Sequence, residues 1–275
     1  MTKRSAQKRI VRPVIDRYFS PAKTGPLWFV FANLILSFGS SRTRVSWDKS
    51  ARMYRFSSPA HNLHVVRSRR LHLYVAGVEK RLNWLVTAYS VDKVGPLDNE
   101  IVVDIGANIG EFSMACEALG ARIHAFEPDP IEFRALALNL SPNAVPHNVA
   151  LWSEVGRKTL WFANDSGDTS LIDSGKSSGS QQVEVTTLDS WADENLAPNE
   201  EIGLLKLEAE GAEPEILQGF ERNIRRCKFI VVDAGFERGF SQDATLPEVS
   251  NFLFSRGFEM FAVGRGSLHT LFRRI

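Results

Sequence analysis

The chain has 275 residues, of which 44% are hydrophobic and 24% charged, a composition that fits a soluble globular protein and excludes a wholly disordered chain. Its net charge is only +1, but residues 1–100 hold 18 Lys or Arg and 6 Asp or Glu, whereas the remaining 175 hold 15 and 26. The basic front half therefore suits phosphates, anionic lipid or an acidic saccharide as a partner, unless it pairs with the acidic back half.

The two cysteines, Cys116 and Cys227, have neither a CxxC partner nor a histidine at metal-binding spacing. This pattern argues against a zinc site, and we expect no metal. Isolated thiols are typical of a reducing compartment, so we expect the protein to be cytoplasmic.

The first apolar stretch covers residues 27–38, within a proline-punctuated region that shows no motif. The stretch is too short to span a bilayer. Its length favours a buried or domain-packing helix. Its basic flanks leave open a helix that lies on a membrane surface, and with it a membrane-associated protein.

Apolar residues at three- and four-residue steps predict an amphipathic helix over residues 69–91, ended by Gly95 and Pro96. We therefore expect a basic, partly helical N-terminal extension over residues 1–95. A separate domain is expected over residues 96–275.

From residue 101 onward, apolar strands alternate with amphipathic helices. Strands are predicted over residues 101–105, 122–126, 145–151, 202–207 and 229–232. Helices are predicted over residues 111–119, 129–140, 212–220 and 246–254. Two extended pieces, 157–162 and 182–187, flank the Ser/Gly/Asp-rich residues 164–180, and an antiparallel pair, 259–263 and 269–272, ends the chain. This alternation predicts an α/β fold with a doubly wound, mostly parallel sheet.

A glycine-containing turn follows the first strand, in the segment Asp104-Ile-Gly106-Ala107-Asn108-Ile-Gly110-Glu111. Glycines at a strand-to-helix turn let the backbone approach a ligand, and the helix N-terminus adds free N–H groups. In a doubly wound sheet, nucleotide ligands bind at this edge. Glu127, which ends the second strand, is placed to hold the two ribose hydroxyls of such a ligand.

The turn is compatible with two cofactors, NAD and S-adenosylmethionine. The G-x-G-x-x-G fingerprint of NAD sites is incomplete, because Asn108 replaces the second glycine. Asp104 is unfavourable beside a pyrophosphate but favourable beside the amino group of a sulfonium cofactor. The terminal antiparallel pair also fits methyltransferases better than dehydrogenases. We therefore favour S-adenosylmethionine, with a dinucleotide site and purely structural glycines as the alternatives.

Residues from about 65 to 275 resemble the FkbM family of methyltransferases. The matching segments are VVDIGANIGEFS (102–113), AFEPDP (125–130), NVALW (148–152), LLKLEAEGAEPEIL (204–217) and VVDAGFERG (231–239). The first two are shared by class I methyltransferases in general, and the block around residues 208–213 is more specific to this family. The resemblance implies a Rossmann-like sheet, S-adenosylmethionine as the cofactor, and O-methylation of a sugar or another secondary hydroxyl.

The same resemblance assigns the cofactor-binding residues. Those of the glycine turn would line the methionine end of the cofactor: Asp104, Gly106, Ala107, Asn108 and Gly110. Glu127 would hold the ribose, and Asn148 and Ala150 would approach the adenine. Asp168 and Ser170, in the Ser/Gly/Asp-rich residues 164–180, either reach the cofactor or the substrate, or are solvated loop residues.

The candidate catalytic residues lie at the end of the fourth strand and are Glu208, Glu210 and Lys206. A sugar hydroxyl is a poor nucleophile, so a carboxylate that takes its proton or orients it is needed. Glu208 and Glu210 would point to the same side if the strand continues through them, with Lys206 as their partner. For Glu210, a cap at a helix N-terminus is an equal alternative. Asp233, after the fifth strand, is placed to contact a polar acceptor.

Glu208 departs from the family pattern, which has Asp at this position. The extra methylene moves the carboxylate by about 1.5 Å, and a shift of that size can cost about 100-fold in rate. We favour an adjusted active site over an inactive one, because Lys206, Glu210 and Gly211 match the family pattern.

The sequence thus predicts an S-adenosylmethionine-dependent O-methyltransferase acting on a hydroxyl of a saccharide or glycolipid. The alternatives are a methyltransferase of a polyketide or other small metabolite, and a non-catalytic cofactor-binding protein of the same fold. No nucleic-acid partner is expected, because no target-base motif follows the fourth strand. Peripheral membrane contact through the basic N-terminal part is the further expectation.

Overall fold

The computed structural model describes residues 18–19, 25–38, 42–163, 169–175, 177–264 and 268–275. The chain forms two compact units, Met1–Asn83 and Trp84–Ile275. This division falls inside a helix, α3 (Val78–Ala88), and precedes the boundary at residue 95 expected from the sequence. Among the described residues, no helix is long and apolar enough to cross a membrane.

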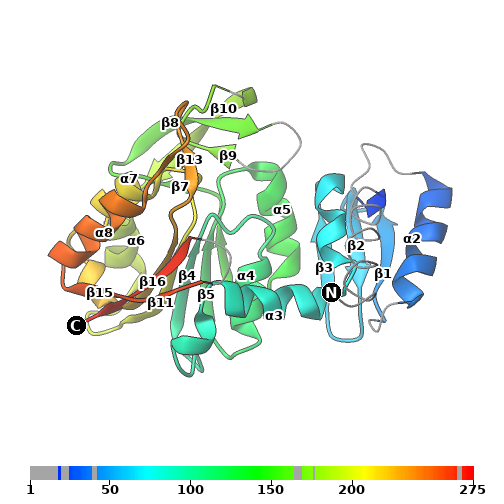
Figure 1. The fold of residues 1–275 in the computed structure, drawn as a ribbon, viewed down its shortest axis with the longest axis horizontal. Coiled ribbons are helices and arrows are strands. Elements are labelled where there is room, and N and C mark those ends of the chain that lie inside the picture. Colours follow the sequence, from blue (N-terminus) through cyan, green and yellow to red (C-terminus); the bar gives the residue numbers. More distant parts are fainter. Residues whose placement is uncertain (1–17, 20–24, 39–41, 164–168, 176, 265–267) are drawn as a thin grey trace, which may run out of the picture. The chain divides into compact units, whose positions relative to one another are not determined.

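The first unit contains a three-stranded antiparallel sheet, formed in order by β1 (Arg44–Asp48), β2 (Met53–Ser57) and β3 (Asn62–Val65). Helix α2 (Pro26–Phe38) packs against β1 (Figure 1). Asn33 joins the two, because its Nδ2 donates to the Val45 carbonyl at 2.9 Å and its Oδ1 accepts from the Val45 N–H at 2.8 Å. The sequence did not indicate this sheet, since its strands are only four or five residues long.

The single helix expected over residues 69–91 is divided into three pieces. They are the 3-10 helix η1 (Ser68–Tyr74), α3, and the 3-10 helix η2 (Val91–Lys93). Gly77 has φ 103° and Ser90 has φ 55°. Left-handed residues do not continue a right-handed helix, so the chain leaves the helical conformation at these two positions. The prediction of one continuous helix was therefore wrong.

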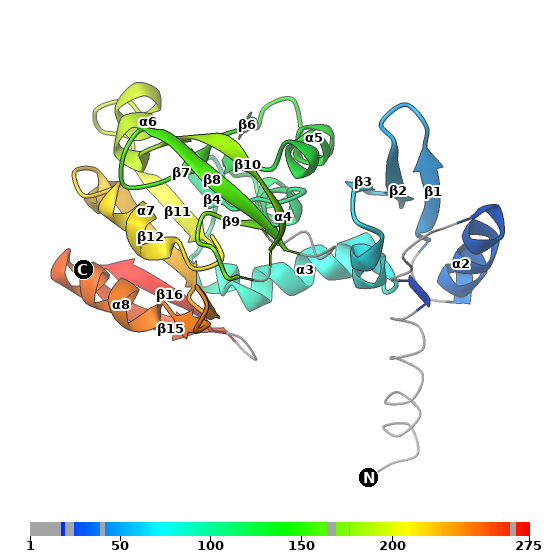
Figure 2. The same ribbon diagram turned by 90° about the horizontal axis from the view of Figure 1, so that it is seen from above.

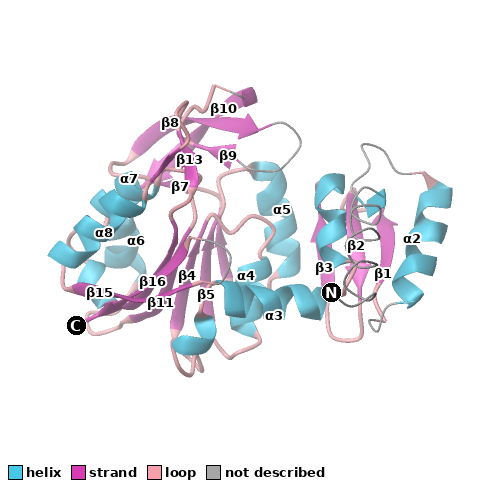
Figure 3. Ribbon diagram, in the orientation of Figure 1, coloured by secondary structure: helices cyan, strands magenta, loops and turns pink. Residues whose placement is uncertain are grey.

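The second unit is built on a seven-stranded sheet of order β15-β16-β12-β11-β4-β5-β6 (Figures 1 and 3). Its strands are β4 (Ile101–Ile105), β5 (Arg122–Phe126), β6 (Val145–His147), β11 (Ile202–Leu207), β12 (Cys227–Asp233), β15 (Phe258–Val263) and β16 (His269–Arg274). The five neighbouring strands β6, β5, β4, β11 and β12 are parallel to one another. Strand β16 is antiparallel to both β12 and β15. The predicted doubly wound sheet and its terminal antiparallel pair are therefore confirmed.

Helices follow the parallel strands, as the alternating pattern predicted. They are α4 (Glu111–Glu117), α5 (Pro130–Asn139), α7 (Glu213–Gln218), with the 3-10 helix η3 (Ile224–Arg226) after it, and α8 (Leu246–Ser255). Helix α5 begins as expected, since the Asp129 carboxylate accepts the Ile131 N–H at 2.8 Å and Pro130 is the first helical residue. Helix α6 (Leu188–Asn195) was not predicted, although Thr187 caps it by accepting the Ser190 N–H at 3.0 Å.

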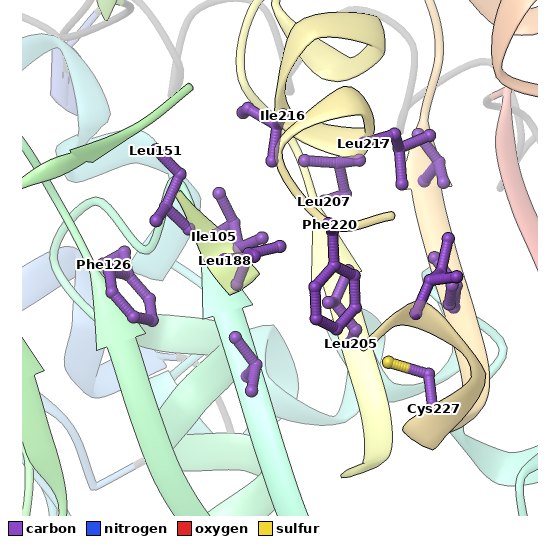
Figure 4. Packing of buried hydrophobic residues seen from close by; sticks show 14 of the residues in the cluster. Ile105, Phe126, Leu151, Leu188, Leu205, Leu207, Ile216, Leu217, Phe220 and Cys227 are labelled. Atoms are coloured by element: carbon purple, nitrogen blue, oxygen red, sulfur yellow. The ribbon is translucent and has the colours of Figure 1, made fainter. Parts of the chain in front are cut away.

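The two faces of the sheet are buried in two separate cores. Ile101, Val103 and Ile105 of β4 face the core that contains α6, α7 and α8, part of which is drawn in Figure 4. Val102 faces the core that contains α3, α4 and α5, the helices that are labelled in Figure 2. Because side chains alternate along a strand, Asp104 lies on the same face as Val102, toward α4.

A smaller sheet and a short hairpin complete the second unit. The sheet has the order β7-β10-β8-β9, with strands β7 (Ala150–Leu151), β8 (Gly156–Ala163), β9 (Thr169–Ser170) and β10 (Ser177–Thr186). The hairpin pairs β13 (Phe236–Arg238) with β14 (Asp243–Ala244). The expected third strand over residues 145–151 is divided between β6 of the large sheet and β7 of the small one.

Candidate functional site

The glycine turn after β4 lies where the strand order reverses, since β4 pairs with β5 on one side and with β11 on the other. The Gly106 and Ala107 N–H groups donate to the Phe126 carbonyl at 3.1 and 2.9 Å. Gly106 has φ +70°, and a Cβ at this position would lie 1.9 Å from the Glu208 carbonyl oxygen. Only glycine lets the turn come this close to the end of β11.

Glu127 is buried at the end of β5, beside the turn. Its carboxylate accepts the N–H of Asn108 and the N–H of Asp129, each at 2.8 Å. Burial raises the pKa of Glu127 to about 8, although these two N–H groups lower it. Asn108 has φ 51°, so the turn directs its N–H at Glu127 from a left-handed conformation that asparagine tolerates.

Asn148 contacts the backbone at Glu127, whereas Ala150 belongs to the smaller sheet. The Asn148 side chain donates to the carbonyl groups of Glu127 and Pro128, at 2.9 and 3.3 Å. Ala150 is buried at the start of β7. The structure therefore brings Glu127, Asn108 and Asn148 together. Asp168 lies outside the described residues.

A buried ion-pair cluster lies on the other side of the turn. Lys206 of β11 is in register with Asp104 of β4, and its Nζ lies 3.0 Å from Asp104 Oδ1 and 2.9 Å from Glu208 Oε2. Nζ also donates to the carbonyl groups of Ile105 and Gly106, at 3.1 and 3.0 Å. Asp104 is fully buried and accepts a hydrogen bond from Ser113 at 2.7 Å. Lys206 thus connects β4, the glycine turn and the end of β11.

Glu208 is the member of this cluster that reaches the surface, with 31% of its side chain exposed. The Tyr89 hydroxyl, just after α3, donates to Glu208 Oε2 at 2.7 Å. Burial raises the pKa of Glu208, but Lys206, Tyr89 and His269 lower it more, to about 2. The pKa of Lys206 is raised despite burial, because Asp104 and Glu208 are close. Both groups are therefore ionised at neutral pH.

Tyr89 is held by a histidine that the sequence did not indicate as a site residue. The His269 ring stacks on the Tyr89 ring with centroids 4.0 Å apart. Its Nε2 lies 2.9 Å from Asp233 Oδ2, and its Nδ1 lies 3.1 Å from the Ala88 carbonyl oxygen. Both ring nitrogens therefore face oxygen atoms, and these two contacts fix the His269 ring beside Tyr89. Asp233, expected to contact an acceptor, contacts His269 in this structure.

Glu210 does not extend the strand beside Glu208, because β11 ends at Leu207. Glu210 has φ 51°, and its carbonyl accepts a hydrogen bond from the Ser170 hydroxyl at 2.8 Å. Ser170 therefore contacts the loop that follows β11. The buried Glu213 carboxylate accepts the N–H groups of Ala209 and Gly211 at 2.8 and 3.2 Å. The condition for Glu208 and Glu210 to point to the same side is not met.

These residues fit an adenosyl cofactor with a charged methionine end. The Gly106 backbone has no side chain between it and Glu208, and a buried carboxyl group ends the neighbouring strand at Glu127. The carboxyl groups of Glu127 and Glu208 offer acceptors for a ribose diol and for donors of the substrate or cofactor. A partly exposed, ionised Glu208 beside the turn can also accept a hydrogen bond from a hydroxyl.

Comparison with known sequences is consistent with this geometry. The model of a family described as the methyltransferase FkbM domain matches residues 104–260. Methyltransferase sdnD of Sordaria araneosa is 28% identical over 215 residues, covering 64% of this chain and 80% of the relative. The 31-O-demethyl-FK506 methyltransferase FkbM of Streptomyces tacrolimicus is 27% identical over 200 residues (59% and 74%). The 2-O-methyltransferase NoeI of Sinorhizobium fredii is 24% identical over 213 residues (70% and 86%).

Similar solved structures include two methyltransferases. The magnesium protoporphyrin IX methyltransferase (ChlM) from Synechocystis PCC 6803 has a TM-score of 0.38 and 11% identity, covering 98% of this chain and 97% of that one. The precorrin-6y C5,15-methyltransferase from Geobacter metallireducens GS-15 has a TM-score of 0.40 and 15% identity, covering 69% and 88%. Similarity at this level adds nothing to the assignment of the site.

Proposed function

The chain belongs to the FkbM methyltransferase family and depends on S-adenosylmethionine, and we propose that it transfers the methyl group to a hydroxyl oxygen of a saccharide or glycolipid. Two of the matched relatives have O-methylation in their names, as a 2-O-methyltransferase and a methyltransferase of a 31-O-demethyl compound. These names support oxygen as the acceptor atom. The resemblance to the FkbM family is what favours a sugar hydroxyl.

The observation that carries the proposal is the environment of Glu208. Its contacts with Tyr89 and Lys206 both go to Oε2, which leaves Oε1 to accept a hydrogen bond from an acceptor hydroxyl. The carboxylate is ionised at neutral pH, since its pKa is about 2. It is also partly exposed beside the glycine turn, where a hydroxyl can reach it.

Glu208 positions the hydroxyl more than it activates it. The cofactor supplies an electrophilic methyl group on a sulfonium when it is bound. An acceptor hydroxyl that donates to Glu208 would be held with an oxygen lone pair free to accept the methyl group. Glu208 would take the hydroxyl proton and pass it to water, while a methyl–oxygen bond replaced the methyl–sulfur bond and S-adenosylhomocysteine was released. A carboxylate with a pKa of about 2 is a weak base, so alignment is its larger contribution.

Lys206 and Glu210 have separate places in this proposal. Lys206 keeps its proton because its pKa is raised, so we assign it to holding Glu208 rather than to proton transfer. Glu210, in the loop after β11, is a second candidate for contacting the acceptor. The proposal also includes the cofactor-binding residues expected from the sequence, which are Asp104, Gly106, Ala107, Asn108, Gly110, Glu127, Asn148, Ala150, Asp168 and Ser170. We also propose that the enzyme is cytoplasmic and contacts a membrane peripherally through its basic first unit.

The test is methyl transfer from radiolabelled S-adenosylmethionine to a panel of sugars, glycolipids and polyketide alcohols. Glu208→Gln is compared with Glu154→Gln, which changes a carboxylate that is 73% exposed and distant from Glu208 in the sequence. We expect labelled sugar or glycolipid, a loss of about 100-fold in kcat/KM for Glu208→Gln, and unchanged activity for Glu154→Gln. S-adenosylhomocysteine affinity should change by less than about twofold in both variants, because Glu208 acts on the acceptor.

Each other outcome supports an alternative. Transfer to a polyketide or another small metabolite alone would move the acceptor away from saccharides. Cofactor binding without transfer to any hydroxyl would favour a non-catalytic protein of the same fold. Full activity of Glu208→Gln would remove Glu208 from the reaction.

A further inference from the structure

Helix α2 exposes an apolar face that nothing in the first unit covers among the described residues. Its 13 residues, PLWFVFANLILSF, include no charged side chain. Four large apolar side chains, spaced as one helical face, are exposed: Leu27 (73%), Val30 (63%), Phe31 (54%) and Leu34 (51%). Isolated exposed apolar residues are ordinary, but a contiguous face of this kind marks an interaction surface.

The opposite face of the same helix is already used for packing. Ala32 and Leu36 are fully buried, and Asn33 exchanges two hydrogen bonds with the Val45 backbone of β1. The polar side chain at the middle of α2 therefore faces the sheet. Because this fixes the rotation of the helix, the residues at 27, 30, 31 and 34 cannot turn inward without breaking both hydrogen bonds.

The unit that carries this face is strongly basic. Residues 1–83 contain 17 Lys or Arg and 3 Asp or Glu. Arg42 and Arg44, which follow α2, are exposed, as are Lys49 and Arg52 of the turn between β1 and β2. Asp48, at that turn, is held by Ser50, Ala51 and His64. Positive charge thus lies close in sequence to the apolar face.

We propose that α2 docks this face on an anionic lipid bilayer, lying in the interface while basic residues of the same unit contact lipid phosphates. A helix of 13 residues is about 20 Å long, well short of the roughly 30 Å hydrocarbon core, so lying flat is the arrangement it fits. An apolar face with adjacent basic residues is the combination that binds anionic membranes, and each basic residue near the surface adds about fivefold in partition. The proposal rests on the membrane contact named in the proposed function and is independent of the methyl acceptor.

Vesicle co-sedimentation of the full chain tests it. The vesicles are phosphatidylcholine alone or phosphatidylcholine with phosphatidylglycerol, each at low and high salt. The Val30→Asp variant is matched with Val155→Asp, which changes a 68% exposed valine of the second unit. We expect binding to the anionic vesicles only, weakened by salt, and a loss of about tenfold or more for Val30→Asp but not for Val155→Asp.

An environment-sensitive fluorophore gives a second measurement. The native thiols Cys116 and Cys227 are fully buried, so a maleimide dye labels an introduced cysteine at Val30→Cys or Val155→Cys. On anionic vesicles, a blue shift is expected for the dye at position 30 and none at position 155. Circular dichroism checks that each variant is folded.

Several outcomes would overturn the proposal. They are unchanged vesicle binding by Val30→Asp, no blue shift at position 30, equal binding to neutral vesicles, or no vesicle binding at all. A dimer that Val30→Asp converts to a monomer, in the absence of vesicle binding, would instead assign the face to a second copy of the chain. Failed methyl transfer would leave this result untouched, so the two proposals fail separately.

Discussion

We predict that Glu127 couples cofactor binding to pH, because its carboxyl group is buried and its pKa is about 8. In the free protein it is therefore mostly protonated at pH 7. Ribose hydroxyls that donate to it would favour the ionised form and lower its pKa. Binding should then release protons near pH 7, and affinity should rise with pH until it levels off above about 8.

Isothermal titration with S-adenosylhomocysteine in phosphate and in Tris at pH 7 measures this release. The Glu127→Gln variant, titrated the same way, subtracts the ionisation of the ligand itself. Equal proton release by both proteins, or an affinity that falls as pH rises toward 8, would mean that Glu127 is not the ribose ligand.

Tyr89 is predicted to position Glu208, since its hydroxyl donates to Glu208 Oε2 at 2.7 Å. Tyr89→Phe keeps the ring on His269 and removes only this hydrogen bond. We expect a loss of about 1 kcal/mol in the free energy of unfolding and about tenfold in kcat. The acid limb of the kcat profile should move to higher pH, because the ionised carboxylate loses a donor.

Chemical denaturation and steady-state kinetics measure both effects. Tyr18→Phe is the control, since the Tyr18 hydroxyl also donates a hydrogen bond, in this case to the Trp28 carbonyl in the first unit. A pH profile that stays in place in Tyr89→Phe would reduce Tyr89 to a packing residue.

The sequence indicated some of these residues and not others, for a physical reason. Lys206 and Glu208 lie on one short segment, so their proximity could be predicted. Tyr89 and Glu208 are 119 positions apart, and the Ala88 carbonyl and His269 are 181 apart. Such pairs arise only once the sheet order is fixed. The left-handed turn at Glu210 was hidden as well, because glutamate rarely adopts it.

At the scale of elements, the approach of the glycine turn to the end of β11 is the contact that shapes the site. Gly106→Ala would place a Cβ 1.9 Å from the Glu208 carbonyl at a φ of +70°. Gly95→Ala shares the left-handed φ, +98°, but has nothing within 4 Å. We therefore expect a loss of about 1 kcal/mol for Gly95→Ala and roughly 2–4 kcal/mol for Gly106→Ala, where overpacking is added.

Thermal or chemical unfolding of the two variants gives these values, and titration with S-adenosylhomocysteine should show weaker binding by Gly106→Ala alone. Equal stability losses would mean that the turn can move away from β11 at little cost, and that the close approach is not needed.

Elements with a strong local signal were predicted, and those without one were not. Strand β4 is buried on both faces and apolar except for Asp104, and its predicted range, 101–105, is the observed one. Helix α5 carries its own cap and proline. In contrast, β1 alternates exposed Arg44 and Ser46 with Val45, a pattern too short to separate from a loop. The apolar pattern over 69–91 predicts one helix, because it does not reveal where left-handed residues interrupt it.

At the scale of the whole molecule, charge is divided between the two compact units. Residues 1–83 hold 17 Lys or Arg against 3 Asp or Glu, and residues 84–275 hold 16 against 29. A protein of net charge +1 with evenly mixed charges would bind ion exchangers weakly. If the basic unit is free to meet an anionic partner, the chain should bind a sulfonate resin and a quaternary-amine resin alike at pH 7.5 and low salt.

Elution from both resins at moderate salt is the expected result, because each exchanger meets one unit of opposite charge. The control is Val30→Asp, which changes the apolar face of α2 but only one of the unit's charges and so should elute close to the unaltered protein. Flow-through on the sulfonate resin would show that the basic and acidic units neutralise each other within the chain. The lipid phosphates would then lack their attraction, leaving α2 to bind neutral and anionic vesicles alike.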